Sequence, residues 1–296
     1  MRDSFDINSN DNALFTTAMC SNRCLMCCQP PSEKNDIDVL WDKNIKLIDT
    51  APLELPSIGI TGGEPTLLGN RFFELIEHIR KRLPDTEIHI LSNGRAFANK
   101  DFTRRLGEIG PEKILLGIPL HSDNQLDHDL IAGADGAYSE TLLGLYNLAR
   151  WSFDIELRVV LTKLNYQRLP KIAHFIYRNL PFVKYISLMG LEYTGFTIKN
   201  AGRVWIDPME MASPLSEATL FLASAGFNVS IFNLQLCVLP EIVWPYARKS
   251  ISDWKNMFAS FCEECSVKTE CCGLFSTSKK QSSRLSPIKT IKCECL

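Results

Sequence analysis

Two spacings of apolar residues follow one another along the middle of the chain. Short β-branched and leucine-rich runs predict strands, and apolar residues at every third or fourth position predict helices. The predicted strands are residues 13–19, 57–61, 87–94, 113–121, 155–165 and 183–192, and the predicted helices are residues 37–49, 70–83, 101–110, 138–151, 168–180 and 207–226. A further strand fits residues 229–240, after which the pattern stops.

Six strand–helix units predict an α/β fold with a parallel sheet and right-handed crossovers. Eight units would close a barrel, whereas six predict a partial, open (β/α)6 barrel or a doubly wound sheet. In either fold the chemistry belongs at the carboxyl ends of the strands. We divide the chain into an N-terminal segment (1–12), a core domain (13–227), a small cysteine-rich extension (228–275) and a Ser/Lys-rich tail (276–296), which we expect to be mobile.

Composition narrows the class of protein. The chain is 45% hydrophobic, with 32 basic and 34 acidic residues, so nucleic acid is not an expected main partner. It has no run of about 18 apolar residues that would predict a membrane span. The polar N-terminus lacks the apolar centre of a signal peptide, and we therefore expect a cytoplasmic protein with reduced thiols.

The cysteines gather at the two ends of the chain. Of 11 cysteines, four precede residue 29 and the others follow residue 236. Cysteines of an ordinary core would be scattered, and a reducing compartment disfavours disulfides, so this clustering indicates binding of a metal or a cluster.

The first group is Cys20-x3-Cys24-x2-Cys27, directly after the first predicted strand. Three thiolates from one tight loop can hold one soft metal centre, but a structural zinc site needs four ligands. Either Cys28 or a distant residue completes the set, or one position stays open for a substrate or cofactor. Adjacent side chains seldom chelate one tetrahedral centre, so we expect Cys28 to lie off the site.

This loop, together with Gly62-Gly63-Glu64-Pro65 after the second strand, resembles the radical S-adenosylmethionine (radical SAM) superfamily. The resemblance covers residues 13–227 and implies a partial (β/α)6 barrel. It also implies that Cys20, Cys24 and Cys27 bind a [4Fe–4S] cluster whose fourth iron chelates S-adenosylmethionine, which is cleaved to a 5′-deoxyadenosyl radical. The family usually has an aromatic residue at the position of Met26.

Further candidates lie at strand ends, where the resemblance places the cofactor. Several also fit an ordinary turn, and a charge at Arg158, inside an apolar strand, also fits a salt bridge. The cofactor-binding candidates are Gly62, Gly63, Glu64, Ser92, Asn93, Arg158, Gly190 and Leu191. His121 and Glu192, at the ends of the fourth and sixth strands, are candidates for proton transfer, although a histidine more often only forms hydrogen bonds.

The second cysteine group comprises Cys237, Cys262, Cys265 and Cys271. By residue type alone, four thiolates suit zinc and an iron–sulfur cluster almost equally. After a radical SAM barrel, however, this spacing resembles the SPASM or twitch extensions of peptide-modifying enzymes, which implies an auxiliary [4Fe–4S] cluster. The sequence assigns no role to Cys28, Cys272, Cys293 or Cys295.

A closer resemblance is to the radical SAM maturases of the His-Xaa-Ser system. It rests on four segments, which read CSNRCLMCCQPP, GITGGEPTLLG, GIPLHSD and LCVLPEIVWPYARKSISDWKN. It implies a ribosomally made peptide substrate, a second radical SAM protein as partner and an external electron donor. The alternatives are a radical SAM enzyme acting on a nucleotide or tRNA base, and a non-enzymatic, zinc-stabilised scaffold.

Overall fold

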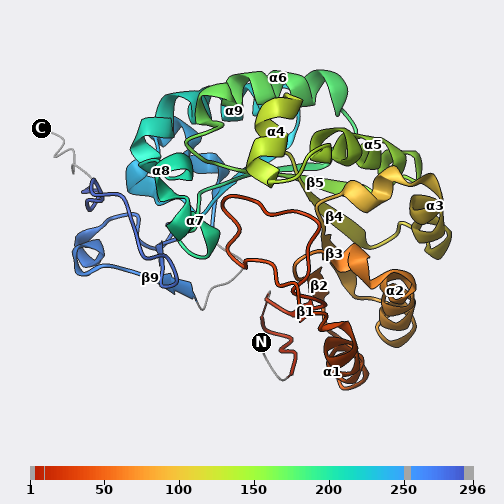
Figure 1. Cartoon of the computed structure of the whole chain (residues 1–296). Coiled ribbons are helices and arrows are strands. Elements are labelled where there is room, and N and C mark those ends of the chain that lie inside the picture. Colours follow the sequence, from red (N-terminus) through yellow and green to blue (C-terminus); the bar gives the residue numbers. More distant parts are fainter. Residues whose placement is uncertain (1–3, 10, 250–254, 290–296) are drawn as a thin grey trace, which may run out of the picture.

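The computed structural model describes residues 4–9, 11–249 and 255–289, and its centre is a parallel sheet of eight strands in sequence order (Figure 1). The strands are β1 (Ala13–Phe15), β2 (Ser57–Thr61), β3 (Glu87–Leu91), β4 (Ile114–Pro119), β5 (Asp154–Val160), β6 (Tyr185–Met189), β7 (Asn228–Phe232) and β8 (Ala247–Arg248). The helices are α1 (Ile37–Asp49), α2 (Asn70–Arg82), α3 (Lys100–Ile109), α4 (Gln125–Ala132), α5 (Ala137–Arg150), α6 (Leu169–Asn179), α7 (Phe196–Lys199), α8 (Ala201–Val204) and α9 (Ala212–Ser224).

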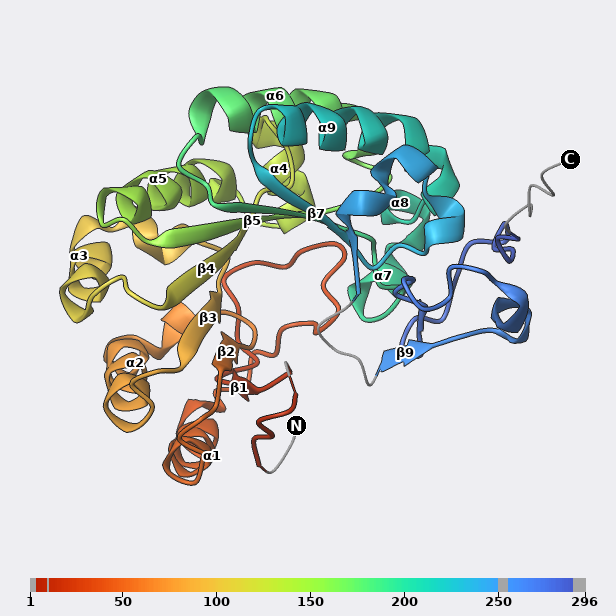
Figure 2. The same cartoon turned by 180° about the vertical axis from the view of Figure 1, so that it is seen from behind.

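The sheet is curved, with most helices along its convex side and the β1–α1 loop across its concave side (Figures 1 and 2). Side chains alternate between the two faces of each strand, so Ile58, Ile60, Ile88 and Ile90 are buried against the helices. The intervening residues line the concave side, and His89 is one of them. The apolar layer thus attaches the helices to the convex side of the sheet.

The predicted α/β fold with a parallel sheet is confirmed, and the sheet continues past residue 227. β7 (Asn228–Phe232) pairs with β6 and covers the first part of residues 229–240, whose apolar pattern allowed one more strand. β8 pairs with β7 through Ala247 and Arg248, which are too few to give any periodic signal. None of the helices among the described residues is both long and apolar enough to span a membrane.

After β8 the chain forms the cysteine-rich region, which includes an antiparallel pair of short strands, β9 (Asn256–Met257) and β10 (Leu274–Phe275). Residues 276–289, predicted as part of a mobile tail, run back along the barrel. Ser282 Oγ lies 2.9 Å from both carboxylate oxygens of Asp207, at the start of the segment that leads into α9. Cys293 and Cys295 lie outside the described residues.

Candidate functional site

The first cysteine group lies on the long loop between β1 and α1, on the concave side of the sheet (Figure 1). Asp36, the residue before α1, anchors the start of this loop, because its carboxylate accepts hydrogen bonds from Thr17 Oγ1 at 2.6 Å and from the Ala18 N–H at 2.9 Å. The middle of the loop is held by the end of α4, where the Arg23 N–H donates to Ala132 O at 3.1 Å. The loop is therefore fixed at both places before any cofactor is considered.

The thiols of Cys20, Cys24 and Cys27 lie close enough to repel one another as thiolates. Burial, followed by the charges of Cys27 and Cys20, raises the pKa of Cys24 to about 12. Burial, with the neighbouring Cys28 and Cys20, raises the pKa of Cys27 to about 11. A positively charged metal centre relieves this repulsion, so the three thiols fit such a centre.

These thiols do not form a single-ion site. Across the ranges that the structure describes, no three His, Cys, Asp or Glu side chains converge as the ligands of one metal ion. A [4Fe–4S] cluster takes one thiolate per iron, so its ligands need not meet at one point. The Asn22 N–H lies 3.4 Å from Cys20 Sγ and provides the kind of hydrogen bond that tunes a cluster thiolate.

Gly62 and Gly63 let the end of β2 approach the cysteine loop. A Cβ on Gly63 would lie 2.1 Å from Met19 O, and one on Gly62, whose φ is +150°, would lie 2.5 Å from Thr17 O. Two hydrogen bonds hold the two segments together, from the Gly63 N–H to Thr17 O at 2.6 Å and from the Glu64 N–H to Met19 O at 2.8 Å. The glycines are thus required by the backbone that leads into Cys20.

Glu64 is fully buried and joins the ends of β2 and β3. Its carboxylate accepts hydrogen bonds from Thr66 N and Oγ1, from Ser92 Oγ at 2.8 Å and from the Asn93 N–H at 2.7 Å. Burial raises the pKa of Glu64, and these hydrogen bonds counteract only part of the rise. Asn93 Nδ2 in turn donates to Ser21 Oγ at 2.8 Å, which extends the network to the cysteine loop. Glu64, Ser92 and Asn93, three of the predicted cofactor-binding residues, are therefore hydrogen-bonded to other residues of the chain in this structure.

Arg158 faces the concave side of β5, where Glu156 Oε1 lies 4.0 Å from its Nε atom, at the outer limit of an ion pair. Its Nε and Nη2 atoms lie 3.3 and 3.2 Å from Met189 Sδ, which is a weak acceptor. The guanidinium group is thus available to a stronger anionic partner.

Gly190 and Leu191 directly follow β6. A Cβ on Gly190 would lie 2.6 Å from Asn233 O, so this position also requires close backbone packing. Leu191 lines a pocket of about 390 Å³ together with Trp205, Asn233 and Lys280.

Two residues before Arg158 on β5, Glu156 forms a polar layer with His89 and Ser187. His89 Nε2 lies 2.9 Å from Glu156 Oε2, and Ser187 Oγ donates to Oε1 at 2.5 Å. Burial alone would raise the pKa of Glu156, but the contacts with His89, Arg158 and Ser187 lower it to about 2. This layer could not be predicted from the sequence pattern, because it joins three separate strands.

The lowered pKa predicts an acid-dependent loss of stability. A carboxylate that is more acidic in the folded than in the unfolded chain stabilises the fold above pH 4.5, its ordinary pKa, and this contribution is lost as the pH falls from 4.5 towards 2. Glu156→Gln should therefore flatten the fall in unfolding free energy between these values, measured by denaturant titration. An unchanged acid profile in the variant would contradict the assignment.

His121 is 2% exposed, and neither ring nitrogen has a hydrogen-bond partner among the residues that the structure describes. Burial, with the neighbouring His128, lowers the pKa of His121 well below its ordinary value, so the ring is neutral. Glu192 accepts a hydrogen bond from Thr277 Oγ1 and lies 3.6 Å from Lys255 Nζ, which places it against the cysteine-rich region. Proton transfer by His121 or Glu192 stays a prediction.

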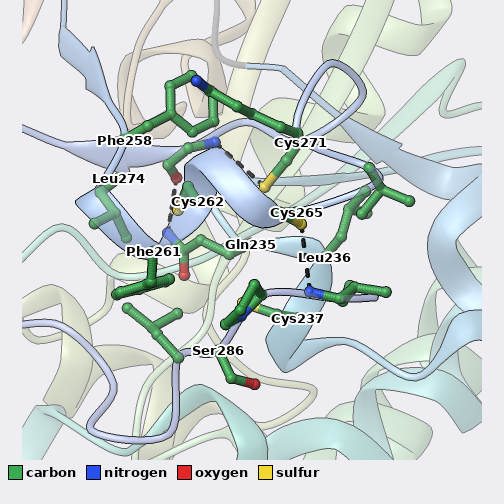
Figure 3. A pocket seen from close by; sticks show the side chains of 16 residues that line it. Gln235, Leu236, Cys237, Phe258, Phe261, Cys262, Cys265, Cys271, Leu274 and Ser286 are labelled. Atoms are coloured by element: carbon green, nitrogen blue, oxygen red, sulfur yellow. Dashed lines mark hydrogen bonds between the residues drawn. The ribbon is translucent and has the colours of Figure 1, made fainter. Parts of the chain in front are cut away.

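The second cysteine group surrounds one pocket of about 400 Å³ (Figure 3). Its walls carry all four predicted cysteines, namely Cys237, Cys262, Cys265 and Cys271. The Ile288 N–H lies 3.4 Å from Cys265 Sγ, and the Gly273 N–H lies 3.4 Å from Cys271 Sγ. Apolar side chains, among them Phe258, Phe261 and Leu274, complete the walls, so the donor set and the enclosure fit an iron–sulfur cluster.

The two remaining described cysteines lie outside these sets. Cys28 is exposed, and its electrostatic neighbours are Glu192, Lys255 and Arg158. Cys272 is buried, lies 3.2 Å from Leu234 O and is absent from the pocket wall.

Comparison with known proteins identifies the family to which the chain belongs. The model of the radical SAM superfamily matches residues 14–176, which is more than half of the chain. The tungsten-containing aldehyde ferredoxin oxidoreductase cofactor-modifying protein of Pyrococcus furiosus is 28% identical over 171 residues. That match covers 55% of this chain and 47% of the relative, so the chain spans about half of the relative's length.

Solved structures share the fold. SuiB from Streptococcus suis, bound to S-adenosylmethionine, superimposes with a TM-score of 0.59 at 16% identity, over 85% of this chain and 54% of SuiB. The protein anSMEcpe, with bound AdoMet and the Cp18Cys peptide, gives a TM-score of 0.56 at 19% identity, over 73% of this chain and 62% of its own. At such identities the likeness concerns the fold alone.

Proposed function

Since the chain belongs to the radical SAM superfamily, we propose that it cleaves S-adenosylmethionine reductively and uses the radical to modify a peptide. One observation carries the proposal. Cys20, Cys24 and Cys27 share one loop over the carboxyl ends of a parallel sheet, held there by the glycines that end β2. Both the sheet and the loop are what this chemistry requires of a protein, namely a rigid mount with thiolates at its opening.

We assign the first cluster to Cys20, Cys24 and Cys27. The structure supports this by the raised pKa of Cys24, caused by its burial and by the nearby Cys27 and Cys20, and by the hydrogen bond from the Asn22 N–H to Cys20 Sγ. When bound, the cluster supplies an electron that breaks a carbon–sulfur bond of S-adenosylmethionine and releases a 5′-deoxyadenosyl radical. The Glu64 network keeps the ends of β2 and β3 and the cysteine loop in fixed relation, so that the cofactor meets a preformed surface.

Arg158 is proposed to bind the carboxylate of S-adenosylmethionine. Its present partner, the Met189 sulfur, is a weak acceptor that a carboxylate would readily replace. Glu156 lies on the same strand, two residues closer to its amino end, and holds the guanidinium electrostatically at 4.0 Å. The backbone of Gly190 and Leu191 is the proposed surface for the adenine.

The four cysteines of the second group are proposed to bind an auxiliary [4Fe–4S] cluster. The enclosed pocket and the backbone N–H groups near Cys265 and Cys271 support this assignment (Figure 3). Because four thiolates leave no iron without a protein ligand, we expect this cluster to carry electrons.

Replacing Cys262 with alanine should halve the iron content. Two clusters give about eight irons per chain after anaerobic reconstitution, and loss of one leaves about four. Cys272→Ala is the matched control, because Cys272 adjoins Cys271 in the sequence but is absent from the pocket wall. Equal iron contents in the two variants would contradict the auxiliary ligand set.

A peptide is the proposed substrate. SuiB is also known bound to its precursor peptide SuiA, and that structure matches this chain with a TM-score of 0.55. The segments that resemble the His-Xaa-Ser maturases point to a peptide with such repeats, to a second radical SAM protein as partner and to an external electron donor.

The substrate class can be tested by isotope transfer. A synthetic peptide with His-Xaa-Ser repeats, deuterated on carbon, is incubated anaerobically with the reconstituted chain, reductant and S-adenosylmethionine. We expect deuterium in 5′-deoxyadenosine and a new peptide mass, and neither with a peptide of the same composition in scrambled order. Cleavage of the cofactor without label transfer, with and without the partner protein, would exclude this substrate.

A further inference from the structure

The cysteine loop, which lies between β1 and α1 and carries Cys20, Cys24 and Cys27, is also held by residues 192–200, which follow β6. Three successive carbonyl groups of the loop accept hydrogen bonds from this segment. The donors are Asn200 Nδ2 to Leu25 O at 2.9 Å, Thr197 Oγ1 to Met26 O at 3.4 Å and the Phe196 N–H to Cys27 O at 2.8 Å. Such a row of contacts fixes both the position and the direction of the backbone that carries Cys24 and Cys27.

Gly195 makes this approach possible. Its φ is +55°, and a Cβ would lie 2.4 Å from Cys27 O and 2.7 Å from Cys28 O. Both atoms belong to the backbone, which cannot move aside as a flexible side chain would. Any larger residue here must therefore displace the loop or the segment.

The same segment also contacts the cysteine-rich region at Lys255, whose Nζ lies 3.6 Å from Glu192, and residues 277–279 directly after that region. Glu192 accepts a hydrogen bond from Thr277 Oγ1. The Tyr193 N–H donates to Ser278 Oγ at 3.0 Å, and Tyr193 O accepts from the Lys279 N–H at 3.1 Å. Figures 1 and 2 agree that α7, in this segment, lies between the cysteine loop and the cysteine-rich region.

We propose that residues 192–200 are a positioning bridge between the two cysteine groups. Through Gly195 and Asn200 the bridge sets the backbone at Cys27, and through Glu192 and Tyr193 it makes that setting depend on the docked cysteine-rich region. Its relevance to catalysis rests on the proposed function, whereas its structural effect exists in the chain without cofactors. The bridge could not be predicted from the sequence pattern, because its contacts join residues that are 171 positions apart, such as Thr197 and Met26.

Hydrogen exchange of the full-length chain without cofactors tests the structural part. Gly195→Ala should speed the exchange of peptides covering residues 23–28 by about tenfold or more, because the left-handed conformation and the close carbonyls both oppose a Cβ. Peptides from β2 to β5 should be unchanged. Gly202→Ala is the control, since a Cβ at Gly202 in α8 meets nothing within 4 Å outside its own helix in the described part of the chain. Equal exchange of residues 23–28 in the two variants would overturn the bridge.

Asn200→Ala covers the case in which Gly195→Ala does not fold, because it removes only the side-chain donor to Leu25 O. It should speed the same peptides by about fivefold, as expected for one lost hydrogen bond. Thr277→Val removes the hydroxyl that donates a hydrogen bond to Glu192. Faster exchange of residues 23–28 in this variant shows that this contact with the C-terminal part of the chain stabilises the cysteine loop. Unchanged exchange in both variants would refute the coupling.

The reconstituted protein supplies a spectroscopic readout. S-adenosylmethionine should change the electron paramagnetic resonance signal of the first cluster in Gly202→Ala, and this response should be reduced in Gly195→Ala at equal iron content. A full response in Gly195→Ala would count against positioning. A chain that binds no cluster at all would instead contradict the proposed function, and the exchange results of the cofactor-free chain would still decide on the bridge.

Discussion

Cys24→Ala is expected to lower reductive cleavage of S-adenosylmethionine by more than about 100-fold, since loss of a ligand exceeds the effect of losing a hydrogen bond to one. Cys24 is the central thiol of the loop, and its pKa of about 12 reflects burial and the charges of both other cysteines. Without it, two thiolates remain for three irons. The measurement is 5′-deoxyadenosine formed after anaerobic reconstitution with excess reductant.

Cys28→Ala is the matched control for this variant. Cys28 adjoins Cys27 in sequence but is exposed, and its electrostatic neighbours include Glu192 and Lys255. Its variant should keep the cofactor cleavage of the unsubstituted chain. The ligand assignment would be wrong if Cys28→Ala lost cleavage while Cys24→Ala retained it.

Glu64→Ala is expected to lower the free energy of unfolding by about 3–5 kcal/mol, because it leaves buried hydrogen-bond donors without their acceptor. The Thr66 N–H, the Ser92 hydroxyl and the Asn93 N–H all donate to this one carboxylate. With the carboxylate gone, the ends of β2 and β3 lose their common partner. Denaturant titration of the cofactor-free chain measures the loss.

Glu108→Ala serves as the comparison, because Glu108 is half exposed on α3 and pairs with Arg104 at the surface. Its cost should not exceed about 0.5 kcal/mol. A similar cost for both variants would mean that the Glu64 network is not a structural centre.

The sequence predicted most of the fold because its signals are local. The alternation that buries Ile58 and Ile60 is visible within five residues, and so is the end of the strand at Gly62. α4 was missed, because it has only eight residues and a weak apolar face, and its cap, the Asn124 side chain on the Asp127 N–H, is a common turn feature. β8 was missed because two residues carry no pattern.

The candidate site was predictable in its cysteines and less so in its supports. The spacing of Cys20, Cys24 and Cys27 is a chemical signal in itself, and so is that of the second group. The role of Gly62 and Gly63 in packing against Thr17 and Met19 depends on how two strands meet, which spacing does not encode.

Contacts between segments that are distant in the sequence could not be predicted either, because residue spacing does not encode tertiary packing. The Glu156 layer joins β3, β5 and β6, and the bridge at residues 192–200 joins the two ends of the chain. Both depend on tertiary packing, whereas the strand and helix patterns depend on near neighbours.

The most direct test of the proposed function is the formation of 5′-deoxyadenosine by the anaerobically reconstituted, unsubstituted chain. We expect reductant-dependent formation from S-adenosylmethionine that is absent when Cys20, Cys24 and Cys27 are all replaced by alanine. Formation that persists in the triple variant, or its absence from an unsubstituted chain with a full iron content, would show that these cysteines do not hold a cluster that cleaves S-adenosylmethionine.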